Sequence, residues 1–242
     1  VASGDSPETV GDEPFQMFSK FGHVHVTVGE ERALAIPEIL HHYPNTNTIL
    51  LDDAYQHRYV QPNLNMLLTD YNRPFFTDFV LPAGRLREAR KGAKRADAVI
   101  VTKCPDSITK KQQEEYVKQI SKYKGNENHI YFTKIAYDTP TAVNKNVSPI
   151  QNLILFSGIA NDTPLVEHVR THYNLLENIT FGDHHAYREQ DIRKLIQVYK
   201  KHSEKISCGI ITTEKDMVKI KNTELEKLLK DIPFFYLPIK PI

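Results

Sequence analysis

The 242-residue chain combines 40% hydrophobic with 25% charged residues, a composition typical of a globular protein with one large domain or two small ones. Its formal net charge is only +1, so the chain as a whole has no electrostatic preference for nucleic acid. Its two cysteines, Cys104 and Cys208, predict neither a disulfide framework nor a thiolate zinc site, and no apolar run approaches the roughly 18 residues of a transmembrane helix.

The first hundred residues predict one helix and three strands. Residues 1–14 lack an initiator Met and are rich in Gly, Ser, Pro and acidic residues, which indicates a loop inside a longer protein. Apolar spacing predicts a helix over residues 29–43, which Pro37 shortens or kinks. Three nearly continuous apolar runs predict parallel strands covered on both faces, at residues 46–53, 64–70 and 96–104.

The middle of the chain predicts more helix and strand and then a boundary. Residues 73–95 indicate a loop followed by a strongly basic helix, and Thr109 with Gln112 forms a capping-box pattern that starts a polar helix. Residues 129–137 are strand-like, and the Pro, Asn and Ser residues after them are typical of a connection. We therefore predict two domains, residues 1–137 and 138–242.

The second half repeats the alternation of strand and helix. Strands are predicted at residues 152–160, 175–181, 208–213 and 234–239, and helices at residues 163–173, 188–201, 214–220 and 222–230. Such alternation predicts a mainly parallel sheet system in two lobes.

Two adjacent carboxylates follow the first apolar run, in the stretch "LLDDAYQHR". Ligands of open α/β sheets bind outside the carboxyl ends of the strands, which is the predicted position of Asp52 and Asp53. Side chains alternate along a strand, so at most one of the two is expected to touch a metal ion directly. The alternative is a strand end followed by an Asx turn.

A basic segment, "LPAGRLREARKGAKR", sets six cationic side chains against one acid, Glu88. On a helix, one face would carry Arg87, Arg90, Lys91 and Lys94. Such a stripe is suited to phosphates or to anionic lipid. A solvated helix face is the other interpretation.

Two polar turns complete the candidates. The loop "FGDHHAY" carries Asp183, His184 and His185, in which an imidazole can act as a general base, orient a carboxylate or bind a metal ion. Two solvated histidines in a surface loop are the alternative. The turn "GDEP" offers Asp12 and Glu13, which by themselves indicate no more than a helix start. The turn "TTEKDMVKI" predicts a capped helix start and no catalytic role.

In this order the segments resemble the tetraacyldisaccharide 4'-kinase (lipid A 4'-kinase) family of Gram-negative bacteria. The resemblance covers nearly the whole chain and rests on "GDEP", "LLDDAYQHR", "LNMLLTD", "LPAGRLRE", "RADAVIVTK", "FSGI", "GDHHAY" and "TTEKDMVK". It implies an α/β fold in which a P-loop-kinase-like, mainly parallel sheet has helices on both faces, with a smaller α/β C-terminal lobe. This chain departs from the usual family pattern at Ala54, Tyr55 and Arg85 without losing a charged group.

The resemblance also implies the reaction and its residues. ATP would phosphorylate the 4'-hydroxyl of a tetraacyldisaccharide 1-phosphate, with Asp12 as the catalytic base and His184 paired with it. Four residues would contact the nucleotide phosphates or the acceptor: Asp53, Arg87, Gln56 and His57. Three acids would be associated with Mg²⁺: Asp52, Asp53 and Glu88.

No GxxxxGK[ST] phosphate loop occurs in the chain. We therefore expect the chain as printed to bind ATP poorly or not at all and to be inactive, as a family protein without its first portion. The resemblance further implies a location at the cytoplasmic face of the inner membrane, whose surface would be a partner, and no nucleic-acid partner.

Two other functions are compatible with parts of the sequence. One is a kinase-like module that binds acyl-sugar phosphates without catalysis. The other is a metal-dependent phosphoesterase of the DHH type, because "DHHA" at residues 183–186 matches the signature of that class. Those hydrolases need further acids in the lobe that carries the motif, whereas the strand-end acids of this chain are predicted in the other lobe.

Overall fold

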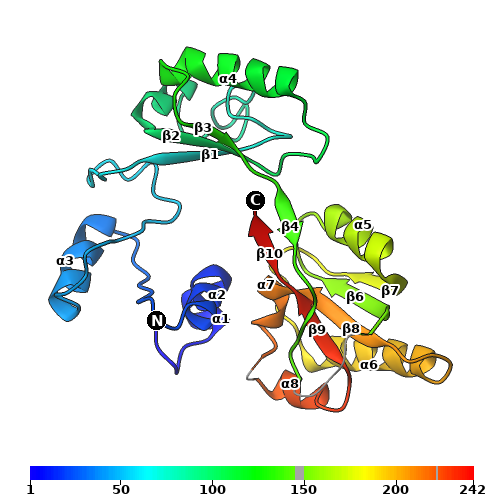
Figure 1. The fold of residues 1–242 in the computed structure, drawn as a ribbon. Helices are drawn as coiled ribbons and strands as arrows, with labels where there is room; N and C mark the ends of the chain where they lie inside the picture. Colours follow the sequence, from blue (N-terminus) through cyan, green and yellow to red (C-terminus); the bar gives the residue numbers. More distant parts are fainter. Residues whose placement is uncertain (145–149, 222) are drawn as a thin grey trace. The chain divides into compact units, whose positions relative to one another are not determined.

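A computed structural model describes residues 1–144, 150–221 and 223–242. The chain forms two compact units (Figure 1). Unit 1 consists of Val1–Val28 and Tyr137–Ile239, and unit 2 consists of Gly29–Ala136 and Lys240–Ile242. The second segment of unit 1 begins at Tyr137, beside the predicted boundary, while Val1–Val28 also belongs to this unit. The division into domains 1–137 and 138–242 stays a prediction.

Unit 2 is built on a three-stranded parallel sheet in the order β1-β2-β3. Its elements in chain order are α3 (Arg32–His42), β1 (Met66–Asp70), the 3-10 helix η1 (Arg90–Arg95), β2 (Ala98–Thr102), α4 (Lys110–Lys124), β3 (Ile130–Phe132) and β4 (Ile135–Tyr137), which pairs with β10 (Ile239–Pro241). One face of the sheet is covered by α4 and η1. Val99 and Val101 of β2 are fully buried there against Ile120 and Ala93.

The capping signals of α4 act as predicted. The Thr109 hydroxyl accepts a hydrogen bond from the Gln112 amide at 3.3 Å, and the Gln112 side chain accepts one from the Thr109 amide at 2.8 Å. The helix ends at Gly125, whose left-handed backbone (φ 94°) a side chain would strain. Both ends of this helix are therefore determined locally.

Unit 1 is built on a five-stranded sheet in the order β5-β9-β8-β6-β7, parallel except for the β5 edge. Its elements are α1 (Pro7–Val10), α2 (Asp12–Lys20), β5 (Thr141–Ala142), β6 (Asn152–Ser157), α5 (Thr163–His172), β7 (Asn174–Thr180), α6 (Glu189–Ser203), β8 (Gly209–Thr213), α7 (Glu214–Met217), α8 (Glu224–Leu228) and β9 (Phe234–Leu237). The strands at the centre of the sheet, β8 and β6, are neighbours although α5, β7 and α6 separate them in the chain.

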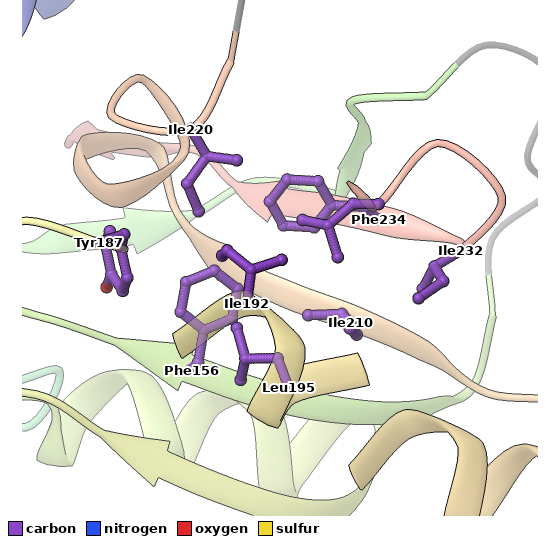
Figure 2. Close-up of a cluster of buried hydrophobic side chains, with 9 residues drawn as sticks. Phe156, Tyr187, Ile192, Leu195, Ile210, Ile220, Ile232 and Phe234 are labelled. Atoms are coloured by element: carbon purple, nitrogen blue, oxygen red, sulfur yellow. The ribbon is translucent and has the colours of Figure 1, made fainter. Parts of the chain in front are cut away.

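Helices cover both faces of this sheet. On one face, Phe156, Ile210 and Phe234 from three strands pack against Ile192 and Leu195 of α6, as Figure 2 shows. On the other face, α5 buries its apolar stripe, consisting of Leu165, Val166 and Val169, against Leu153, Leu155, Ile211 and Phe235. Ile192 and Leu195, which are three positions apart, thus belong to the buried face of α6.

Four local predictions are wrong. Residues 1–14 are not one loop, because they contain α1 and the start of α2. Residues 46–53 form no strand, and Leu50 is 85% exposed, because an apolar run becomes a strand only where a neighbouring strand pairs with it. The strand predicted at residues 129–137 is divided into β3 and β4. The predicted basic helix is a short 3-10 helix that begins at Arg90, so Arg87 does not share a helical face with the other basic residues.

None of the helices in residues 1–144, 150–221 and 223–242 combines the length and the apolar composition that crossing a bilayer demands.

Candidate functional site

A carboxylate and an imidazole meet within unit 1. Asp12 is the first residue of α2, where a negative charge interacts favourably with the positive end of the helix dipole. It follows Gly11, whose φ is 93°. His184 lies in the loop after β7 with a left-handed backbone (φ 55°). The His184 Nδ1 lies 3.1 Å from Oδ2 of Asp12. The two residues predicted to form the catalytic pair are therefore in contact, although 172 positions separate them.

The neighbours of the His184 ring assign its tautomer. The Lys215 Nζ lies 3.3 Å from Nε2 of His184. An ammonium group can only donate, so Nε2 accepts and the proton resides on Nδ1, which donates to Asp12. The Asp183 carboxylate is farther from Nε2, at 3.9 Å. His184 is accordingly a donor that orients the Asp12 carboxylate.

A third residue, Lys219, contacts Asp12 and was missed by the sequence analysis. Its Nζ lies 3.0 Å from Oδ2 of Asp12 and 3.7 Å from Oδ1 of Asp216, which is fully buried. The turn that carries both residues starts at Thr213, whose hydroxyl accepts a hydrogen bond from the Asp216 amide as predicted for a helix cap. Alternating charges in a capped turn are common on protein surfaces, so the pattern contained no signal that this lysine is buried.

Unit 2 contains a second cluster of charges, centred on Glu88. Arg95 donates to both carboxylate oxygens, at 2.6 and 2.9 Å, in a bidentate pair. Arg58 donates to Oε2 at 2.8 Å, and the Gln56 amide donates to Oε1 at 3.2 Å. The Glu88 side chain is only 18% exposed. Two guanidinium groups and an amide therefore engage both of its oxygens.

Small and aromatic residues hold this cluster together. A Cβ on Gly92 would lie 2.6 Å from Oε2 of Glu88, so only glycine leaves room for the carboxylate. The Arg95 guanidinium lies 4.7 Å from the centre of the Tyr55 ring, and the Tyr55 hydroxyl donates to the Gly92 carbonyl at 3.0 Å. Burial raises the pKa of Tyr55 to about 12, so this hydroxyl keeps its proton at neutral pH. A shallow pocket that Tyr55, Gln56, Arg87 and Glu88 help to line lies beside the cluster.

Asp52 and Asp53 lie in an irregular turn. Asp53 has a left-handed backbone (φ 45°), and its amide donates to Oδ1 of Asp52 at 3.0 Å. Arg87 donates to Oδ2 of Asp53 at 2.9 Å, in a pair whose two side chains are largely exposed. His57 contributes to a backbone turn, with its amide donating to the Ala54 carbonyl. Arg87 and Asp53 thus remain accessible to a ligand.

The described residues contain no ready-made set of three metal ligands. They contain no group of three His, Cys, Asp or Glu side chains placed to hold a metal ion. Glu88 is saturated by cationic donors, and Asp53 is paired with Arg87. Asp52, Asp53 and Glu88 are therefore not brought together as a ligand set. Their role in Mg²⁺ binding stays a prediction.

The geometry of Glu88 predicts a stability that depends on pH. Hydrogen bonds from Arg95, and then from Arg58 and Gln56, lower the pKa of Glu88 from 4.5 to about 2 against the effect of burial. A folded-state pKa below the unfolded value stabilises the fold above pH 4.5, and this contribution is lost as the pH falls toward 2. We expect Glu88→Gln to lower the free energy of unfolding at pH 7 by about 2 kcal/mol, less than the full pKa shift implies because Arg58 is largely exposed.

Urea unfolding at pH 7 and pH 3 measures this effect. The loss caused by Glu88→Gln should shrink at pH 3, because the carboxyl of the unfolded wild-type chain is protonated there while the folded one is still mostly ionised. Glu127→Gln, at an exposed position of the same unit, is the matched control and should change the free energy of unfolding by less than about 0.5 kcal/mol. An equal loss at both pH values would contradict the charged hydrogen-bond cluster.

Comparison with known proteins assigns the family. The model of the family "LpxK: Tetraacyldisaccharide-1-P 4'-kinase" matches residues 1–241. A tetraacyldisaccharide 4'-kinase of Phocaeicola vulgatus is 38% identical over 250 residues, covering 97% of this chain and 66% of the relative. Another, of Flavobacterium psychrophilum, is 39% identical over 240 residues with the same coverage. The chain thus spans just under two thirds of the length of these curated relatives.

A solved structure agrees with these relatives. The "apo" form of LpxK from Aquifex aeolicus, described as a complex with ATP, matches with a TM-score of 0.64 at 23% identity, covering 99% of this chain and 67% of that one. This match confirms the predicted fold class, an α/β fold of the P-loop kinase type. With a family model that matches residues 1–241, the chain belongs to the tetraacyldisaccharide-1-phosphate 4'-kinase family.

Proposed function

We propose that the protein transfers the γ-phosphoryl group of ATP to the 4'-hydroxyl of a tetraacyldisaccharide 1-phosphate. The observation that carries this proposal is the Asp12 carboxylate, held by His184 at 3.1 Å and by Lys219 at 3.0 Å. The names of the relatives support the acceptor, and the Aquifex aeolicus structure solved with ATP supports the donor. A carboxylate that two neighbouring side chains hold in place is suited to accept the proton of a sugar hydroxyl.

The contacts of Asp12 assign different tasks to its two oxygens. Both contacts, from the His184 ring and from the Lys219 ammonium group, go to Oδ2, and no donor to Oδ1 is found in the described part of the chain. Oδ1 would accept the proton of the 4'-hydroxyl while the hydroxyl oxygen attacks the γ-phosphorus and the bond to the β-phosphate oxygen breaks, releasing ADP. A positioned base of this kind contributes roughly a hundredfold to ten-thousandfold to the rate.

In this proposal, side chains of unit 2 bind the phosphates. Arg87 is well placed for an incoming anion, because its side chain is 60% exposed and its partner, Asp53, is also exposed. Gln56 and His57 would add polar contacts. Mg²⁺, when bound, would neutralise phosphate charge, with Asp52 and Asp53 as its accessible carboxylates and Glu88 only if the ion pairs with Arg58 and Arg95 open.

The acyl chains of the proposed acceptor have a consequence for location. A tetraacylated sugar resides in a membrane, so we propose that the protein works at the cytoplasmic face of the bacterial inner membrane and meets its surface as a partner. Nucleic acid has no part in this function, in line with a net charge of +1.

The test is transfer of labelled phosphate from ATP to a tetraacyldisaccharide 1-phosphate in detergent micelles, with the full-length protein and residues 1–242 side by side. We expect transfer by the full-length protein and none by the shorter chain, which contains no GxxxxGK[ST] loop. Acceptor binding without transfer by either protein would favour a non-catalytic module. Metal-dependent hydrolysis of a phosphodiester without ATP would favour a phosphoesterase.

A further inference from the structure

We propose that Lys219 is a positioning residue of the phosphoryl-transfer reaction, which orients the Asp12 carboxylate. This inference rests on the proposed role of Asp12 as the base that takes the proton of the acceptor hydroxyl. It assigns a function to the turn after β8, which by its composition predicts only a helix start.

The burial of Lys219 shows that it acts through another residue. Its side chain is 5% exposed, so the ammonium group is not accessible to a sugar or a nucleotide. The Nζ donates to the His185 carbonyl at 3.2 Å and lies 3.0 Å from Oδ2 of Asp12 and 3.7 Å from Oδ1 of Asp216. The three protons of the ammonium group thus face three oxygens from three segments of unit 1, with Asp216 the most distant.

Asp216 fixes the position of the ammonium group. Its Oδ2 accepts hydrogen bonds from the Gly158 amide at 2.9 Å and from the Thr213 hydroxyl at 2.8 Å. These contacts anchor it where the neighbouring strands β6 and β8 end. A side chain at Gly158 would be tightly packed, because its Cβ would lie 3.0 Å from the Tyr187 hydroxyl and 3.2 Å from Oδ1 of Asp216. Among the described residues, no hydrogen bond to Oδ1 of Asp216 is found. The charge of Lys219 therefore compensates a buried carboxylate that is rigidly held.

The arrangement has two effects on Asp12. Lys219 and His184 both engage Oδ2, which turns the free lone pairs of Oδ1 toward an acceptor hydroxyl. One ammonium is shared between the carboxylates of Asp12 and Asp216, so the three groups carry a net charge of −1. Because Asp216 shares the ammonium group, Lys219 holds the Asp12 carboxylate in place without cancelling its negative charge completely.

The first test is kinetic and uses the full-length protein. We expect Lys219→Met to lower kcat about 10- to 100-fold while KM for ATP changes less than twofold, because a misplaced base affects the transition state and not nucleotide binding. In an Asp12→Asn background the same substitution should cause no further loss.

Lys124→Met is the matched control, since Lys124 is also buried, at 6% exposure, and belongs to unit 2. Lys219→Met leaves the buried negative charge of Asp216 without a neighbouring cation, which could prevent folding. If this single variant does not fold, the double variant Lys219→Met with Asp216→Asn, which removes both charges, replaces it in the assay.

The second test does not need activity. NMR of the histidine rings reports the titration of His184, identified by the signal that His184→Gln removes. Three charged groups face this ring: Asp12 from α2, Lys215 from α7 and Asp183 from its own loop. Removing the nearby cation favours protonation of the ring, so we expect the His184 midpoint to rise by about half a pH unit or more in Lys219→Met and not in Lys124→Met.

The two tests distinguish the proposals from each other. If the wild-type protein transfers no phosphate but the His184 midpoint rises, the proposed function falls and the coupling of Lys219 to the Asp12–His184 pair stands. If the wild-type protein is active and Lys219→Met changes neither kcat nor the His184 midpoint, the proposed function stands and the role of Lys219 is overturned. A further loss of kcat in the Asp12→Asn background would also overturn it, because Lys219 would then act independently of Asp12.

Discussion

Replacing Asp12 by Asn in the full-length protein should lower kcat by roughly a hundredfold to ten-thousandfold with little change in KM for ATP. The amide keeps the size of the carboxylate but cannot accept the proton of the acceptor hydroxyl at Oδ1. Asp231→Asn changes the same chemical group at an exposed position and should leave kcat unaffected. Steady-state kinetics with both substrates varied would measure the effect.

The partner of Asp12 gives the sharper version of this prediction. His184→Ala should also lower kcat, because Asp12 loses the donor that orients its Oδ2. The double variant should be less impaired than the product of the single losses predicts, since both substitutions damage one unit. His129→Ala is the matched control, because His129 is exposed and has a left-handed backbone (φ 56°) like that of His184. Fully multiplicative losses would contradict a functional pair.

The largest effect on stability is expected from Phe156→Ala. Phe156 of β6 is fully buried between strands and α6, and its ring lies 5.4 Å from that of Tyr187 and 6.1 Å from that of Phe234 (Figure 2). Truncating a buried Phe leaves a cavity and removes apolar area, which costs about 3–5 kcal/mol. Because β6 leads directly into the Gly158 turn under Asp216, this loss would also loosen the support of Lys219.

Hydrogen exchange separates this effect from global unfolding. Amides of β6 and β8 should lose protection in Phe156→Ala, whereas amides of β2, in unit 2, serve as an internal control that keeps its protection. Phe79→Ala is the matched substitution at a side chain that is 61% exposed, and it should cost less than about 1 kcal/mol. Unchanged protection of β6 would contradict the packing of this core.

The structure reproduces the sequence predictions best where the signal is local. Thr109 and Gln112 determine the start of α4, because a capping box involves residues within one helical turn. Ile192 and Leu195 are buried as the apolar spacing of α6 predicts. Residues 46–53 show the limit of such reasoning: an apolar run indicates a tendency to be buried, while strand formation requires a hydrogen-bonded neighbour elsewhere in the chain.

The sequence by itself determined the family of the protein, its alternating strands and helices and most of their boundaries, because motifs, caps and apolar periods are properties of short segments. The resemblance implied the pairing of Asp12 with His184, but only the tertiary structure decided which other charges meet. Lys219 joins this pair from a distant segment, and Glu88 pairs with Arg58 and Arg95. A charged side chain can pair with any opposite charge that folding brings within about 4 Å, so its partner depends on long-range packing that no local pattern contains.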